Sequence, residues 1–157
     1  MKKSTTLFFL FVALISWQCT EDNQASQSDH PPLIFGSNHG FCLGNCAHLF
    51  KYENGEVFRD EMDKLEVNFV FSDTPDPELL ESAQRILEDF PEELKVNSQE
   101  TYGCPDCADQ GTLILQLTEG DGTRRWYLDT RIQEDWSQDL KDFVDLLKKE
   151  LEEIIIL

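Results

Sequence analysis

Hydrophobic and polar residues alternate along several short stretches of the chain, and this period of two predicts β-strands. The first candidate is residues 33–36. Within residues 48–61, two aromatic-containing runs flank Asn54-Gly55, a pair favoured in tight turns, so this stretch predicts a β-hairpin. Residues 65–72 alternate as well, which predicts a strand with one buried side.

A second hairpin is predicted nearer the C-terminus. Leucines occupy every second position of residues 112–119, and Gly-Asp-Gly at 120–122 turns the chain into residues 123–130. We therefore expect two hairpins plus two further strands, all antiparallel.

Two stretches instead repeat their apolar residues with helical spacing. Residues 74–91 form an amphipathic stripe, with Asp76 suited to the N-cap, Pro77 suited to the first turn and Pro91 ending the helix. A second helix is predicted from about Ser137 to the C-terminus. The expected fold is α+β, an antiparallel sheet of two hairpins with two amphipathic helices packed on one face, in the order β-β-β-β-α-β-β-α.

The N-terminal region predicts an exported lipoprotein. Two lysines precede an apolar run at 7–15, which is the length of a secretory signal and too short to span a bilayer. Cys19 follows at a position that resembles the lipobox cysteine of bacterial lipoproteins, although Ser16 and Gln18 stand where Leu and a small residue are usual. We expect residues 1–18 to be a signal peptide, 19–32 a lipidated cysteine with a flexible tether, and 33–157 one domain.

Charge narrows the classes of partner. The chain has 31 acidic and 13 basic residues, a formal charge of −18. Such a surface repels nucleic acid, so no nucleic-acid partner is expected. It suits either solubility in the bacterial cell envelope or a partner protein with a basic surface. We expect an outer-membrane lipoprotein, facing the periplasm or the cell exterior.

If Cys19 carries lipid, four cysteines remain in an oxidising compartment. They form two close pairs, and the expected state is disulfides between local partners: Cys42 with Cys46 and Cys104 with Cys107. Cross-pairing would close longer loops and is the energetic alternative.

Two other uses of the four thiols are possible. A zinc site could use the same cysteines together with His39 and His48. A thiol–disulfide oxidoreductase would place Cys-x-x-Cys at a helix N-terminus, where the helix lowers the first thiol's pKa. No helix is predicted after Cys107, and Asp106 and Asp109 would oppose that pKa shift.

The motifs also resemble those of a group of small bacterial lipoproteins of unknown function. The stretches that carry the likeness are 35–58, with its Cys-x3-Cys turn and hairpin, 103–111 (GCPDCADQG) and 126–130 (WYLDT). The resemblance implies an exported single domain. It implies no activity and no catalytic residues.

Enzyme signatures are scarce, because the sequence has no phosphate-binding Gly-rich loop, nucleophile elbow or His-Glu-x-x-His motif. The expected function is a membrane-anchored extracytoplasmic binding or interaction module, for example an inhibitor of a basic toxin or enzyme. Zinc binding and thiol–disulfide exchange are the alternatives, and no cofactor is expected unless zinc is bound.

Overall fold

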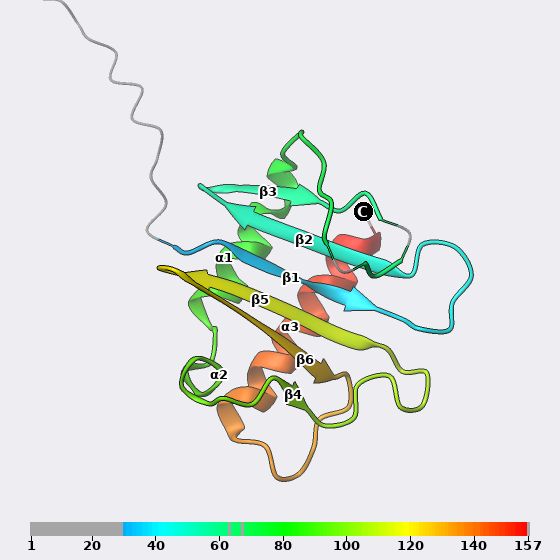
Figure 1. Ribbon diagram of the computed structural model, residues 1–157, viewed down its shortest axis with the longest axis vertical. Coiled ribbons are helices and arrows are strands. Elements are labelled where there is room, and N and C mark those ends of the chain that lie inside the picture. Colours follow the sequence, from blue (N-terminus) through cyan, green and yellow to red (C-terminus); the bar gives the residue numbers. More distant parts are fainter. Residues whose placement is uncertain (1–29, 63, 67, 157) are drawn as a thin grey trace, which may run out of the picture.

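The computed structural model describes residues 30–62, 64–66 and 68–156. One six-stranded sheet carries helices on one side and a long loop on the other (Figure 1). The elements in chain order are β1 (Leu33–Asn38), β2 (Ala47–Glu53), β3 (Glu56–Arg59), the 3₁₀ helix η1 (Pro77–Leu79), α1 (Leu80–Glu88), α2 (Glu92–Val96), β4 (Thr101–Tyr102), β5 (Thr112–Glu119), β6 (Gly122–Asp129) and α3 (Gln138–Ile156).

The strands lie in the order β3-β2-β1-β5-β6-β4, so the first strand of the chain is central. The two predicted hairpins are β2–β3 and β5–β6, and β1 pairs antiparallel with both β2 and β5. Asn54 and Gly55 form the first turn with φ of 54° and 84°, the positive values that a tight hairpin turn requires.

The expected α+β class is confirmed, but the expected purely antiparallel sheet is wrong. At the sheet edge, β4 runs parallel to β6, with Thr101 opposite Tyr127 and Tyr102 opposite Leu128, so the sheet is mixed. A strand of two residues has no alternation to detect, and its direction depends on where the preceding helices leave the chain.

Within residues 30–156, as far as they are described, the chain forms three α-helices where two were expected. The predicted helix at 74–91 is η1 followed by α1, and Asp76 accepts a hydrogen bond from Glu78 N at 3.1 Å as the expected cap. The unpredicted helix α2 begins after Pro91 and has only five residues. The C-terminal helix α3 agrees with its prediction.

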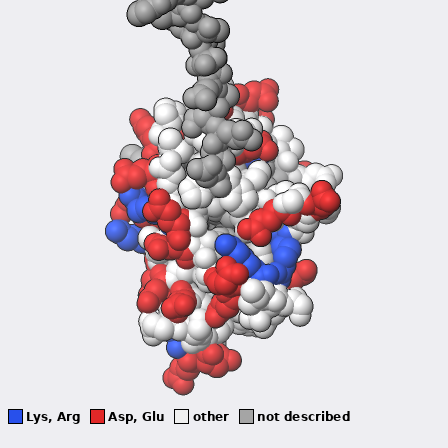
Figure 2. Space-filling model, turned by 90° about the vertical axis from the view of Figure 1, so that its left-hand side faces the viewer, with Lys and Arg blue, Asp and Glu red and all other residues white. Residues whose placement is uncertain are grey.

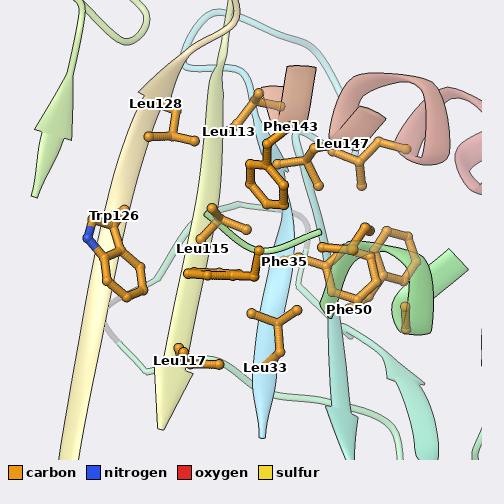
Figure 3. Packing of buried hydrophobic residues seen from close by; sticks show 14 of the residues in the cluster. Leu33, Phe35, Phe50, Leu113, Leu115, Leu117, Trp126, Leu128, Phe143 and Leu147 are labelled. Carbon is orange, nitrogen blue, oxygen red and sulfur yellow. The ribbon is translucent and has the colours of Figure 1, made fainter. Parts of the chain in front are cut away.

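The main core lies between the sheet and the helices (Figure 3). Phe90 packs edge-on against Trp126 and Phe143, with ring centroids 5.5 and 5.6 Å apart. Alternate residues of β1 and β5 point into this layer, and burial of these side chains supplies most of the driving force for folding.

The strand expected at 65–72 is not formed. Of its described residues, only Phe71 makes a β-bridge, with Asp60, and Val67 lies outside the described residues. The segment instead crosses the face of the sheet opposite the helices, where Phe69 and Phe71 pack near Leu49 (Figure 1). Backbone hydrogen bonds from Glu61 N to Val70 O at 3.0 Å and from Ser72 N to Arg59 O at 2.9 Å hold the end of the segment beside the chain that follows β3. Phe69 and Phe71 are half-buried by packing on the sheet, which accounts for the apolar alternation.

Candidate functional site

Three loops leave the sheet at one end. Asn38 pairs with Ala47 and Thr112, and Thr112 pairs with Asp129, so these four strand ends lie side by side. The connections that follow are residues 39–46, 103–111 and 130–137, here called the loop end. The opposite end is where the chain enters at Leu33, here called the entry end, and Thr118 N binds Pro32 O there at 3.0 Å.

The first connection is closed by a disulfide between Cys42 and Cys46, whose Cα atoms are 5.7 Å apart. Two large apolar side chains of this loop are exposed, Phe41 at 85% and Leu43 fully. Most exposed apolar residues are solitary and need no explanation. Phe41 directly precedes the ring that the Cys42–Cys46 disulfide closes, and Leu43 lies within it. We call these two exposed apolar side chains the apolar tip.

The second connection is closed by a disulfide between Cys104 and Cys107, with Cα atoms 5.5 Å apart. It is joined to the first connection by Asp106, whose carboxylate accepts hydrogen bonds from Gly40 N at 3.1 Å and Gly111 N at 3.2 Å. Gly111 has a φ of 83°, and a Cβ at this position would lie 2.7 Å from the His39 ring. The two cysteine loops are therefore packed against each other.

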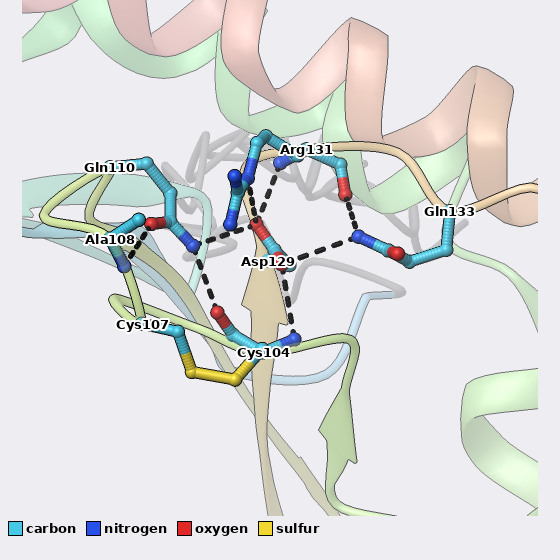
Figure 4. The surroundings of a disulfide bond; sticks show 7 residues. All are labelled: Cys104, Cys107, Ala108, Gln110, Asp129, Arg131 and Gln133. Carbon is cyan, nitrogen blue, oxygen red and sulfur yellow. Dashed lines mark hydrogen bonds and ion pairs between the residues drawn. A yellow bond between two sulfur atoms is a disulfide. The ribbon is translucent and has the colours of Figure 1, made fainter.

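Asp129 organises the base of the loop end (Figure 4). Its carboxylate is 1% exposed and accepts hydrogen bonds from Cys104 N at 3.0 Å, Arg131 N at 2.9 Å and Gln110 Nε2 at 3.1 Å. Gln133 Nε2 adds a longer contact of 3.3 Å. One buried side chain thus holds the second cysteine loop to the loop that follows β6.

Electrostatics keep Asp129 ionised. Burial by itself raises the pKa of this carboxyl, but hydrogen bonds from Arg131 N, Cys104 N and Gln110, together with the Arg131 charge, outweigh burial and lower the pKa below its ordinary value. A carboxylate held in this way is a structural anchor for the loops.

The residues considered for zinc do not form a metal site in the structure. Each cysteine is bonded to its local partner, and within the described part of the chain no three His, Cys, Asp or Glu residues are grouped to hold a metal ion. His39 lies beside Gly111, whereas His48 is half-buried within β2. Zinc binding would need both disulfides reduced and the ligands rearranged.

The redox alternative also lacks its usual setting. No helix begins at Cys104, because residues 105–108 form a turn and β5 begins at Thr112. Asp106, with a φ of 59°, and Asp109, with a φ of 55°, adopt left-handed backbone conformations in this loop. The helix N-terminus that activates a Cys-x-x-Cys thiol is therefore absent from this described loop.

Sequence reasoning did not identify Asp129 or the role of Asp106. In the sequence, Asp129 stands out only as part of the stretch 126–130, and Asp106 only as an acid that would oppose a lowered thiol pKa. The available signal was an acidic residue at the last position of an apolar strand, close to Thr130 and Arg131. Its hydrogen-bond donors lie between 2 and 25 positions away, and the distant ones, on Gln110 and Cys104, are not revealed by any local pattern.

The disulfide prediction has a direct test. Intact protein, purified without reductant and treated with iodoacetamide, should gain no alkyl group at Cys42, Cys46, Cys104 or Cys107, because all four sulfurs are oxidised. In peptide mapping, cleavage of the chain between Cys104 and Cys107 should give two peptides that remain joined by the disulfide between these residues. Alkylation of these four cysteines before reduction would contradict the structure and revive the zinc and redox alternatives.

Comparison with known proteins does not assign the chain to a family. No protein-family model matches the sequence, and a search of curated proteins found no similar one. Within the described residues, no helix has the length and apolar character needed to cross a membrane.

Proposed function

We propose that the chain is a membrane-anchored extracytoplasmic lipoprotein that acts as a binding module, with its loop end as the binding surface. The observation that carries the proposal is the apolar tip, formed by exposed Phe41 and Leu43 on a disulfide-closed loop. Aromatic side chains are enriched in the cores of protein–protein interfaces, and a disulfide that preorganises the loop lowers the entropic cost of binding.

The apolar tip lies at the end of the domain opposite the entry end, where the tether would join it. This position supports a partner that is not part of the membrane in which the lipid anchor would insert. Residues 19–32 would connect Cys19 to the entry end, and β1 separates that end from the loop end by six residues, about 20 Å of strand. A short tether attached at one end leaves the opposite end free to meet a partner.

The charge around the apolar tip favours a basic partner. Asp109, Glu134 and Asp135 are exposed on the neighbouring connections, where Arg131 is the exposed basic residue. Acidic side chains are also spread over the entry end, with a few basic ones among them (Figure 2). Complementary charge accelerates association and excludes partners of like charge. The proposed partner is therefore a protein with a basic surface and an apolar recess. The chain would act on it as an inhibitor acts on a basic toxin or enzyme.

A site-specific photo-crosslinker tests this proposal in cells. Placed at Leu43, it should form an adduct with a discrete basic protein, whereas the same crosslinker at Val96 should not. Val96 is a matched control because it is 70% exposed and apolar, yet α2 lies at the entry end, where Arg124 binds the carbonyls of Lys95 and Asn97.

Lipidation of Cys19 can be measured in the same cells with labelled palmitate. Labelled palmitate should enter the wild-type chain and not the Cys19→Ser variant. Adducts of equal yield at both crosslinker positions would refute the loop end as the binding surface, and adducts with lipid alone would refute a protein partner. Palmitate in the Cys19→Ser variant would refute lipidation at that residue.

A further inference from the structure

A pocket of about 530 Å³ lies between the loop end of the sheet and the C-terminal turns of α3. Buried Leu113 and Leu151 line it together with exposed Ile155, and most of its surface is apolar. Its volume falls in the range of small-molecule sites, which are apolar with a few polar groups that orient the ligand.

The polar groups of this pocket are mainly cationic or neutral. Arg131 and Lys148 line it, with Glu152 as the one carboxylate among its lining residues. The remaining lining residues are Ser37, His39, Gln110 and Thr130. In a chain with a formal charge of −18, a pocket with two cations and one acid is an exception to the general surface.

Of the two cations, Lys148 has no partner among the described residues. It is half-buried, yet it makes no ion pair and no hydrogen bond to any described residue. Its neighbour Lys149 approaches Glu153 at 3.9 Å. Half-burial of a lysine usually covers its methylene stem and leaves the ammonium accessible. The three donors of the Lys148 ammonium are therefore available to an anion in the pocket, and charge-assisted hydrogen bonds of this kind are stronger than neutral ones.

Arg131 has spare donors as well. Its Nε lies 3.8 Å from Asp129 Oδ1, which is too long for a hydrogen bond, and its side chain is 58% exposed. The carboxylate of Asp129 is already occupied by three shorter hydrogen bonds. The guanidinium can therefore turn its fork towards a second anion.

We infer that this pocket binds an amphiphile with an apolar chain and a single anionic head group. The apolar chain packs on Leu113, Leu151 and Ile155, and the head group binds Lys148 and Arg131. The inference goes beyond the proposed function, because it adds a small-molecule ligand and holds whether or not the chain is lipidated. The pocket borders the loop end through His39, Gln110, Thr130 and Arg131, but neither Phe41 nor Leu43 lines it.

Isothermal titration calorimetry with three C12 probes below their micelle concentrations tests the inference. Dodecanoate should bind with a stoichiometry of one, dodecyl maltoside weakly, and dodecyltrimethylammonium least. Adsorption driven by overall charge would give the reverse order, because a chain of charge −18 attracts the cationic probe. Dodecyl phosphate serves as a fourth arm that distinguishes a phosphate from a carboxylate head group.

Variants then locate the binding. Lys148→Gln should weaken dodecanoate binding roughly tenfold, the effect of losing one charge-assisted contact. Lys149→Gln, the same change on the exposed neighbour, should leave it unchanged. Ile155→Trp should weaken dodecanoate binding, because the larger ring takes up part of the pocket where the apolar chain packs. Since Ile155 is 38% exposed, the variant should still fold.

All arms use the full chain, so any binding to its apolar residues 7–15 is common to every variant. Equal losses in Lys148→Gln and Lys149→Gln would overturn the inference, as would preference for dodecyltrimethylammonium. Unaltered dodecanoate binding in the Ile155→Trp variant would overturn it as well.

Discussion

The Asp129→Ala variant should lose about 3 kcal/mol of unfolding free energy at neutral pH, the cost of leaving several buried donors without their charged acceptor. The affected groups are Cys104 N, Arg131 N and Gln110 Nε2. Urea unfolding followed by tryptophan fluorescence measures the loss. Hydrogen exchange should accelerate at the amides of Cys104 and Arg131, and not at Gly111 N, which binds Asp106.

Acidification should reduce the difference in unfolding free energy between the wild type and the Asp129→Ala variant. The folded pKa of Asp129 is below its ordinary value, so its charge stabilises the protein above the ordinary aspartate pKa of about 3.9. That contribution is lost as the pH falls from about 4 through the lowered folded pKa. The free-energy gap between wild type and Asp129→Ala should therefore narrow over this acidic range.

Asp129→Asn is the matched control, because it keeps the size of the side chain and one accepting oxygen. It should fall between wild type and Asp129→Ala at neutral pH. A loss in Asp129→Ala of less than 1 kcal/mol, or a gap to wild type that widens on acidification, would show that Asp129 does not anchor the loop end.

The second large effect is expected at the contact between α1 and α3. Arg85 donates two hydrogen bonds to the carboxylate of Glu150, from Nε at 2.9 Å and from Nη2 at 2.7 Å, and Glu150 is 1% exposed. Burial raises the pKa of Glu150, but the Arg85 and Ser82 hydrogen bonds and the Arg85 charge lower it overall. The hydrogen bond to Glu150 raises the pKa of Arg85 in turn.

Arg85→Met should cost about 3 kcal/mol at neutral pH, because it leaves a buried carboxylate unpaired. We take the lower end of the usual range since the Arg85 side chain is 38% exposed, so water screens part of the interaction. In the variant the pKa of Glu150 should rise, and protonation in acid should recover part of the loss. Urea unfolding at neutral and acidic pH measures both effects.

Two further variants separate charge from packing. Replacing both partners, Arg85→Met with Glu150→Met, should restore most of the stability because no unpaired charge remains. Glu81→Gln removes only the exposed pair to Arg85 and should change stability by less than about 0.5 kcal/mol. The interpretation would be wrong if the double variant were less stable than Arg85→Met alone.

The elements that carry a strong period were predictable from the sequence. The two hairpins, the N-cap at Asp76 and the long helix α3 agree with expectation. In each case the signal is local, either a turn pair such as Asn54-Gly55 or an apolar stripe along a single helix. The helix α2 and the two-residue strand β4 were missed because neither is long enough to show a period.

Segment 65–72 shows where a correct local pattern gives a wrong element. Alternation reports that one side of an extended segment is buried, but it does not report what buries it. Here Phe69 and Phe71 are half-buried against the face of the sheet formed by Leu49 and Ile114, so the alternation arises without a regular strand.

The sequence by itself determined the α+β class, the hairpins, the helical stripes and the close spacing of each cysteine pair, because these depend on residues a few positions apart. Only the tertiary structure decided that residues 39–46 and 103–111 meet, that Asp129 anchors them, and that Lys148 faces an apolar pocket. Gly40 and Asp106 are 66 residues apart, and strand register brings them together. Register is set by the packing of the whole sheet against its helices, which no single stretch of the chain contains.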